Sequence, residues 1–103
     1  MDIIESASRV ATIVASGRAR YDDEPILQDA LIRRVEIIGE AAARLSDEFK
    51  ALHPQVPWRR AVAMRNRTAH GYFDIDLDLV WEVADKDVPG LASHVQQILD
   101  ETS

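Results

Sequence analysis

Apolar residues recur at intervals of three and four along almost the whole chain, which is the spacing of one face of an α-helix. The longest such run begins at Pro25 and continues for about 25 residues, to Phe49. No stretch alternates apolar and polar residues for long enough to predict a β-strand. The sequence therefore predicts an all-α protein.

Four interruptions of this pattern divide the chain, near residues 22–25, 51–57, 71–74 and 87–90. Before the first, the apolar stripe of residues 3–14 stops at Gly17, a residue that often ends helices. Acidic residues followed by Pro25 then predict the start of the long helix, because acids favour the positive end of the helix dipole and proline is tolerated in a first turn.

The second half of the chain predicts two or three more helices. Pro57 and Trp58 start one that runs to about His70, and Gly71 is placed to end it. Asp74 is a suitable N-cap for the next, and Pro89 either kinks that helix or begins a fifth. Because short connections make neighbouring helices antiparallel, we expect an up-and-down bundle of four to five helices.

The long helix carries a second apolar line, on a different side from the first. Its members are Ile26, Ala30, Ile37, Ala41 and Leu52. A helix that is apolar on two sides is usually packed on two sides. In so short a chain, a second copy can supply the second contact, so we expect a homodimer.

Length and composition narrow the class of protein. The chain has 103 residues, which predicts one domain over 1–103, and it has no cysteine for disulfides, thiolate metal sites or cysteine nucleophiles. No apolar run is long enough to cross a membrane, and the first residues carry acids instead of the bases of a secretory signal. We therefore expect a cytoplasmic protein, and the three scattered histidines give no case for a metal or another cofactor.

Charge is distributed unevenly. The net charge is −6, which disfavours non-specific binding to nucleic acid, yet residues 58–70 hold four arginines and no acid. This local excess of positive charge indicates a binding surface for an anion. The alternative is that these arginines form ordinary salt bridges with the acidic helices.

The same segment contains the string RNRTAHGY, from Arg65 to Tyr72. It resembles the Arg-x4-His-x-Tyr motif of HEPN-domain proteins, specifically the HepT-like toxins. Three other stretches resemble that family in the same order: VEIIGEAAARL at 35–45, VPWR at 56–59 and LVW at 79–81.

This resemblance implies a HEPN-like, homodimeric, all-helical ribonuclease that acts as a toxin and needs no metal ion. It also implies an antitoxin partner, a small nucleotidyltransferase that silences the toxin by attaching AMP to the tyrosine of the motif, here Tyr72.

Helix geometry limits how the motif can work. Positions five apart on a helix point about 140° from each other, so Arg65 and His70 do not share a face, whereas Asn66 and His70 do. Arg65 and His70 can still act on one substrate if His70 lies at the frayed end of the helix, or if two protomers bring their copies of this helix together. A composite dimer site also supplies two histidines.

The chemistry of these side chains suits RNA cleavage through the 2′-hydroxyl. One imidazole takes the hydroxyl proton and the other protonates the leaving 5′-oxygen, because histidine titrates near neutral pH. Arg65 would stabilise the charge on the phosphate oxygens, and Asn66 would orient His70 or bind phosphate. Three further arginines would bind RNA phosphates: Arg59, Arg60 and Arg67.

Each motif residue also has a structural interpretation. His70 can cap the end of its helix, Tyr72 and Phe73 can pack in a turn, and Arg65 can pair with Glu36 or Glu40. Outside the motif we interpret His53 and His94 as structural or surface residues. The two tryptophans, Trp58 and Trp81, are expected to anchor the core.

A second functional hypothesis fits the acidic net charge. In it the protein is a catalytically silent helical module that docks a nucleotidyltransferase and presents a nucleotide or Tyr72 to it. A third is a helical dimerisation protein without a chemical role. The sequence does not identify the RNA or its cleavage site.

Overall fold

A computed structural model describes residues 2–68 and 76–102, and the side chains of residues 3–64 and 76–101 within them. Every regular element in these ranges is a helix, which confirms the predicted all-α class. The helices are α1 (Asp2–Ala15), α2 (Arg18–Asp23), α3 (Pro25–Arg44), α4 (Asp47–Leu52), α5 (Trp58–Thr68), α6 (Leu77–Glu82), the π-helix η1 (Val83–Asp87) and α7 (Val88–Thr102).

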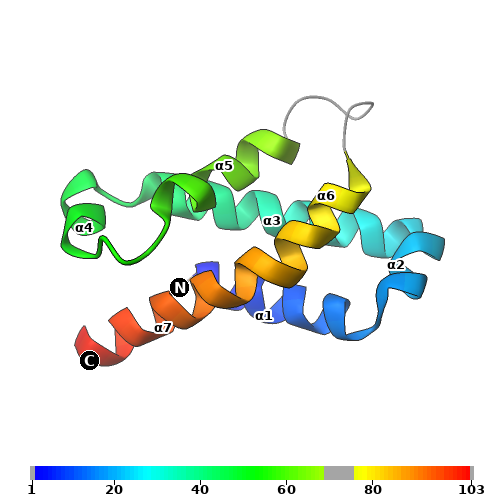
Figure 1. The fold of residues 1–103 in the computed structure, drawn as a ribbon, viewed down its shortest axis with the longest axis horizontal. Helices are drawn as coiled ribbons and strands as arrows, with labels where there is room; N and C mark the ends of the chain where they lie inside the picture. The colour runs from blue at the N-terminus through cyan, green and yellow to red at the C-terminus, as the bar shows by residue number, and fades with distance from the viewer. Residues whose placement is uncertain (1, 69–75, 103) are drawn as a thin grey trace.

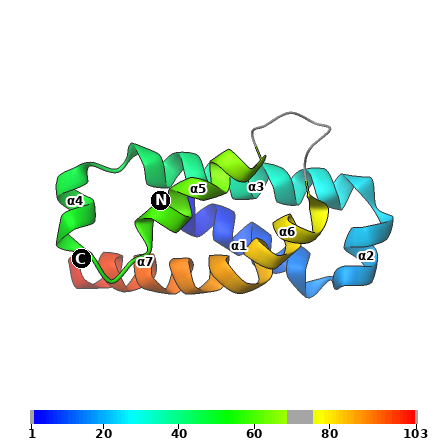
Figure 2. The same ribbon diagram turned by 45° about the horizontal axis from the view of Figure 1, so that its top comes forward.

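The helices form a bundle around α3. Helices α1 and α5 both pack along α3, and α7 packs against α1 (Figures 1 and 2). Helices α6, η1 and α7 follow one another as a single rod, while α2 and α4 are short helices at opposite ends of α3 (Figure 2). Within the described ranges, no helix is both long enough and apolar enough to cross a membrane.

The core consists of the apolar faces that the spacing predicts. The largest fully buried side chains on α1 and α3 include Ile3, Val10, Leu31, Val35 and Ile38. The rod contributes a matching buried line, composed of Val80, Val83, Ala84, Val88, Leu91, Val95 and Ile98. The helical pattern of the sequence therefore identifies the inward faces correctly.

The connection between α1 and α3 contains a helix that the sequence does not predict. Helix α1 stops at Ala15, and Gly17 follows with a φ of 98°, in the left-handed region that favours glycine. Six residues then form α2 before Pro25 begins α3. The predicted start at Pro25 is confirmed, although the Glu24 carboxylate accepts hydrogen bonds from Arg20 at 2.7 and 3.2 Å and caps no backbone N–H.

The long helix is shorter than predicted. Helix α3 ends at Arg44 because Leu45 adopts an extended backbone, with φ −67° and ψ 142°. The Ser46 hydroxyl then accepts a hydrogen bond of 3.0 Å from the Phe49 N–H and caps α4. A serine followed by two acids is a strong helix-start signal, and here it outweighs the continuing apolar spacing. Leu52 therefore belongs to α4, where it is exposed.

The rod begins two residues later than predicted. Asp76 caps α6, accepting hydrogen bonds from the N–H groups of Asp78 and Leu79 at 3.0 and 3.1 Å. The predicted cap, Asp74, lies outside the described residues. Pro89 is the second residue of α7, and the π-helix η1 directly precedes α7, so the rod continues through the proline without a break.

The second apolar line of α3 is only partly covered within the chain. Ile37 and Ala41 are half-buried, whereas Ile26 is 81% exposed. The expectation of a homodimer stays a prediction.

Candidate functional site

Helix α5 carries the arginine-rich segment and is seated firmly on α3. Trp58, Ala61 and Met64 are buried on its inner side. The indole N–H of Trp58 donates a hydrogen bond of 3.0 Å to the backbone carbonyl of His53, so the first residue of the helix is held by the preceding loop. On the other side of its first turn, Arg59 and Arg60 are exposed.

The two described arginines at the start of α5 differ in their surroundings. Arg60 is exposed and forms an ion pair of 3.3 Å with Asp87 of η1. Arg59 is also exposed, but it has no ion-pair partner among the residues with described side chains. The hypothesis that these arginines form salt bridges is therefore confirmed for Arg60, whereas for Arg59 it finds no support among the described side chains.

The motif spans the end of α5 and the residues after it. The backbone positions of Arg65, Asn66 and Arg67 lie in the last two turns of α5, as the sequence predicts. Their side chains are outside the described part of the chain, so the alternative pairing of Arg65 with Glu36 or Glu40 stays open. His70 and Tyr72 lie outside the described residues.

On the other side of the motif, α2 holds the start of α6. The Tyr21 hydroxyl donates a hydrogen bond of 2.8 Å to the carbonyl of Leu77, and Arg18 forms ion pairs with Asp22 of α2 and Asp78 of α6. The guanidinium of Arg18 also lies over the rings of Tyr21 and Trp81, at 5.7 and 5.8 Å. We call this cluster the α2–α6 anchor.

Tyr21 is the centre of the anchor and is fully buried. Burial raises the pKa of Tyr21 to about 12; the positive charge of Arg18 opposes this shift, and the neighbouring acids add to it.

Sequence reasoning missed the anchor because α2 has too few apolar residues to show a periodic pattern. The available signals were the spacing of four between Arg18 and Asp22 and a lone aromatic residue in a charged segment.

The structure supports the interpretation of both tryptophans as packing residues. Trp58 is buried, and Trp81 packs its ring against Tyr21 with the ring centroids 5.0 Å apart. His53 packs against Phe49, with centroids 4.8 Å apart. His94 of α7 is half-buried, and its Nδ1 atom has no hydrogen-bond partner among the described residues.

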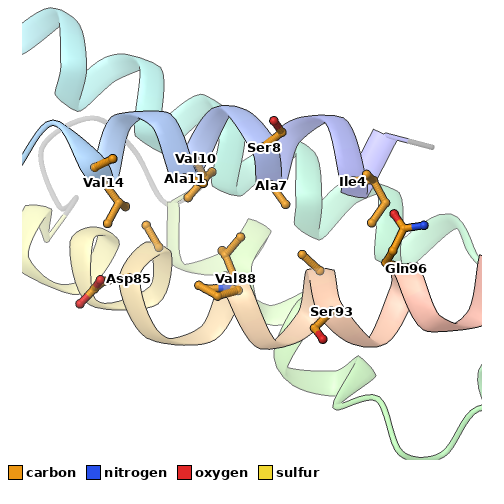
Figure 3. Close-up of a pocket in the computed structure, with 14 residues that line it drawn as sticks. Ile4, Ala7, Ser8, Val10, Ala11, Val14, Asp85, Val88, Ser93 and Gln96 are labelled. Atoms are coloured by element: carbon orange, nitrogen blue, oxygen red, sulfur yellow. The ribbon is translucent and has the colours of Figure 1, made fainter.

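A separate apolar groove lies between α1 and the rod. It has a volume of about 530 Å³, and Figure 3 shows α1 on one side and η1 and α7 on the other. Small and apolar side chains such as Ala7, Ala11, Val88 and Ala92 line it, and Asp85 is the one ionisable residue among its lining. Neither of the two described arginine side chains of α5, Arg59 and Arg60, lines this groove.

Comparison with known proteins places the chain in a family. The family model described as "Ribonuclease HepT-like" matches residues 3–98. A "Probable ribonuclease HepT" of Thermococcus cleftensis is 39% identical over 71 residues, which cover 69% of this chain and 64% of that protein. A "Putative RNase" of Methanocaldococcus jannaschii is 35% identical over 96 residues, covering 92% of this chain and 88% of the relative.

A longer relative shows the same similarity. The "Gamma-glutamylcyclotransferase and putative RNase" of Methanocaldococcus jannaschii is 45% identical over 75 residues, which cover 73% of this chain and 34% of that protein. The match thus spans about a third of this relative and less than two thirds of the Thermococcus protein. No solved structure matches the chain. With a family model matched over nearly its whole length, the chain belongs to the HepT-like ribonuclease family.

Proposed function

We propose that this protein is an endoribonuclease that cleaves RNA through the 2′-hydroxyl of its substrate and needs no metal ion. The observation that carries the proposal is the family match over residues 3–98, which includes every position of the motif from Arg65 to Tyr72. Relatives named as ribonucleases support it. The seating of α5, with its inner face buried and Arg59 exposed, agrees with a role in holding RNA.

The proposed reaction is a transfer at phosphorus. The 2′-oxygen forms a bond to phosphorus as the bond to the 5′-oxygen breaks, which gives a cyclic phosphate and a free 5′-hydroxyl. One His70 imidazole accepts the 2′-hydroxyl proton, and a second His70 imidazolium donates a proton to the leaving oxygen. Arg65 stabilises the negative charge that develops on the phosphate oxygens, and Asn66 orients His70 or binds phosphate.

We propose that two copies of the chain form this site together. Positions 65 and 70 of a regular helix point about 140° apart, so the Arg65 and His70 side chains of one protomer do not face the same phosphate. A two-fold axis near α5 brings two motifs to one cleft and supplies both histidines. Because each α5 packs on its own α3, the dimer would use the outer face of α5.

The proposed biological role is that of the toxin of a cytoplasmic toxin–antitoxin pair. Its partner is a nucleotidyltransferase that attaches AMP to Tyr72. The adduct adds bulk and a negative charge beside the arginines of α5, so it repels the RNA phosphates.

A cleavage assay tests the enzymatic proposal. We expect the wild-type protein to cut single-stranded RNA in the presence of EDTA and to leave a cyclic phosphate, while His70→Ala and Arg65→Ala lose the activity. Arg44→Ala is the matched control, because it removes an arginine that is exposed on α3, away from the motif. Equal cleavage by wild type and His70→Ala would refute the mechanism.

A second candidate function is a catalytically silent module that binds the nucleotidyltransferase. The net charge of −6 favours it, because an acidic protein repels RNA. Incubation with ATP and a small nucleotidyltransferase of the proposed antitoxin class, followed by intact-mass measurement, distinguishes the two. An AMP adduct on a protein that never cleaves RNA supports the silent module.

A further inference from the structure

An open cleft lies between α4 and the first half of α5. Its volume is about 570 Å³, within the range of sites that bind small molecules or single nucleotides. The lining residues are Asp47 and Lys50 of α4 and Trp58, Arg59, Val62 and Ala63 of α5. The cleft therefore shares Arg59 with the predicted RNA-binding residues and adds Lys50, which the sequence does not single out.

The two cations of this cleft lack ion-pair partners. Among the residues with described side chains, neither Lys50 nor Arg59 forms a salt bridge. Most other cations of the described chain are paired with carboxylates: Arg9, Arg18, Arg20, Arg33, Arg60 and Lys86. In a chain with an excess of six acids, two unpaired cations lining one cleft leave it with a local net positive charge, because Asp47 is the one acid in its lining.

The rest of the lining is apolar. Val62 and Ala63 are half-buried, and Trp58 is buried with its indole N–H committed to the His53 carbonyl. A phosphate at Lys50 and Arg59 would thus have an apolar surface beside it, which suits a ribose or a base. A simple inorganic anion would leave that surface uncovered.

The cleft and the first residues of the motif share helix α5. Positions 59, 62, 63 and 66 fall on one face of a regular helix, and α5 is helical over all of them. The rise from position 59 to position 66 is about 10 Å, a distance that a short stretch of single-stranded RNA spans. Bound RNA could therefore occupy the cleft and reach the motif together.

We propose that Lys50 and Arg59 bind the backbone phosphate of one RNA nucleotide, whose sugar and base lie against Val62 and Ala63, to one side of the scissile bond. The inference rests on the proposed ribonuclease function and extends it to a substrate subsite outside the motif. Lys50 is a binding residue here and takes no part in the bond-breaking step.

Binding of a non-cleavable RNA tests the subsite separately from catalysis. The probe is a single-stranded oligonucleotide with 2′-O-methyl groups, and its Kd is measured by fluorescence anisotropy at several salt concentrations. We expect Lys50→Gln and Arg59→Gln each to weaken binding about fivefold. Each should also reduce the slope of log Kd against log salt, by at most the ~0.7 of one phosphate contact to a single strand, because both cations bind the same phosphate.

The control is Arg44→Gln, which removes one positive charge from an exposed side chain that does not line the cleft. We expect it to leave the salt slope unchanged. In the cleavage assay, Lys50→Gln should raise KM and leave kcat near that of the wild type. Melting temperatures of all three variants show whether any of them fails to fold.

Two outcomes would overturn the subsite. The first is an RNA affinity and salt slope of Lys50→Gln equal to those of Arg44→Gln in a wild-type background that cleaves RNA. The second is a loss of nucleotidyltransferase binding by Lys50→Gln with RNA binding intact, since the cleft would then be a protein interface. A wild-type protein that neither binds nor cleaves RNA instead refutes the proposed function itself.

Discussion

The Tyr21 hydroxyl donates a 2.8 Å hydrogen bond to the carbonyl of Leu77, a residue 56 positions later in the chain. Leu77 is the first residue of α6, and α6 follows directly after the part of the chain that contains the motif. The short helix α2 therefore holds the start of α6 in place. Its contribution to stability and its pH dependence can both be measured.

Replacement of Tyr21 by phenylalanine should destabilise the protein by about 1–2 kcal/mol. The ring would keep its contact with Trp81, while the part-buried hydrogen bond to the Leu77 carbonyl would be lost. Urea denaturation followed by circular dichroism measures the difference. Tyr21→Ala should cost about 3–5 kcal/mol, because it also removes a fully buried ring. A Tyr21→Phe protein as stable as the wild type would show that the hydrogen bond contributes nothing.

The raised pKa of Tyr21 makes stability fall at high pH. An ordinary tyrosine has a pKa near 10, whereas burial raises that of Tyr21 to about 12 in the folded protein. Below pH ~10 the folded and the unfolded protein both keep the phenol proton of Tyr21, and its contribution to stability is fully present. As the pH rises toward ~12, the unfolded chain loses the proton first, and up to about 2–3 kcal/mol of stability is lost.

The Tyr21→Phe variant provides the comparison for this effect. Other groups titrate in the same range, but they are common to both proteins. We expect the stability difference between wild type and Tyr21→Phe to shrink as the pH rises from about 9 to about 12. A difference that stays constant over this range would contradict the shifted pKa.

Ser46→Ala distinguishes the observed helix ends from the longer helix that the apolar spacing predicts. Ser46 caps α4, so its replacement should cost about 1 kcal/mol. If one helix ran through this position, alanine would instead stabilise it by a few tenths of a kcal/mol, because alanine has the higher helix propensity. The melting temperature shows whether Ser46→Ala destabilises or stabilises the protein. Ser93→Ala, at an exposed position of α7, is the control and should change stability little.

The arginines at the start of α5 should differ in their effect on RNA binding. Arg60 pairs with Asp87, so part of its charge is already neutralised, whereas Arg59 has no such partner within the described side chains. We therefore expect Arg59→Gln to weaken RNA binding more than Arg60→Gln. We also expect Asp87→Asn to strengthen it, because this change releases Arg60. Anisotropy titrations at one fixed salt concentration rank the RNA affinities of the three variants. A greater loss of affinity for Arg60→Gln than for Arg59→Gln would contradict this prediction.

The helical periodicity was enough to predict the bundle and its core. Residues such as Leu31, Val35 and Ile38 face inward because their spacing requires a common face. The same pattern wrongly predicts a continuous helix between Leu45 and Phe49. There the chain leaves the helix at Leu45, and the Ser46 side chain caps a new one. It also missed α2, since that helix is stabilised by contacts with α6 that no short window of sequence contains.

The candidate site could be predicted where its residues are close in sequence. Arg59 and Arg65 stand out because they share one helix that lacks acids. Lys50 does not, because it is a single lysine beside Asp47 and Glu48 on another helix. Its place next to Arg59 depends on how residues 53–57 turn the chain back, and the hydrogen bond between Trp58 and His53 sets that turn.

The two tryptophans of the chain lie on either side of the motif in sequence and in different surroundings. Trp58 is buried at the start of α5, and Trp81 rests against Tyr21 and Arg18 in the α2–α6 anchor. Replacing either one with phenylalanine leaves a single tryptophan. The protein thus carries an optical reporter for each border of its motif, and the emission of each can follow, without any added dye, whether RNA or a partner disturbs that border.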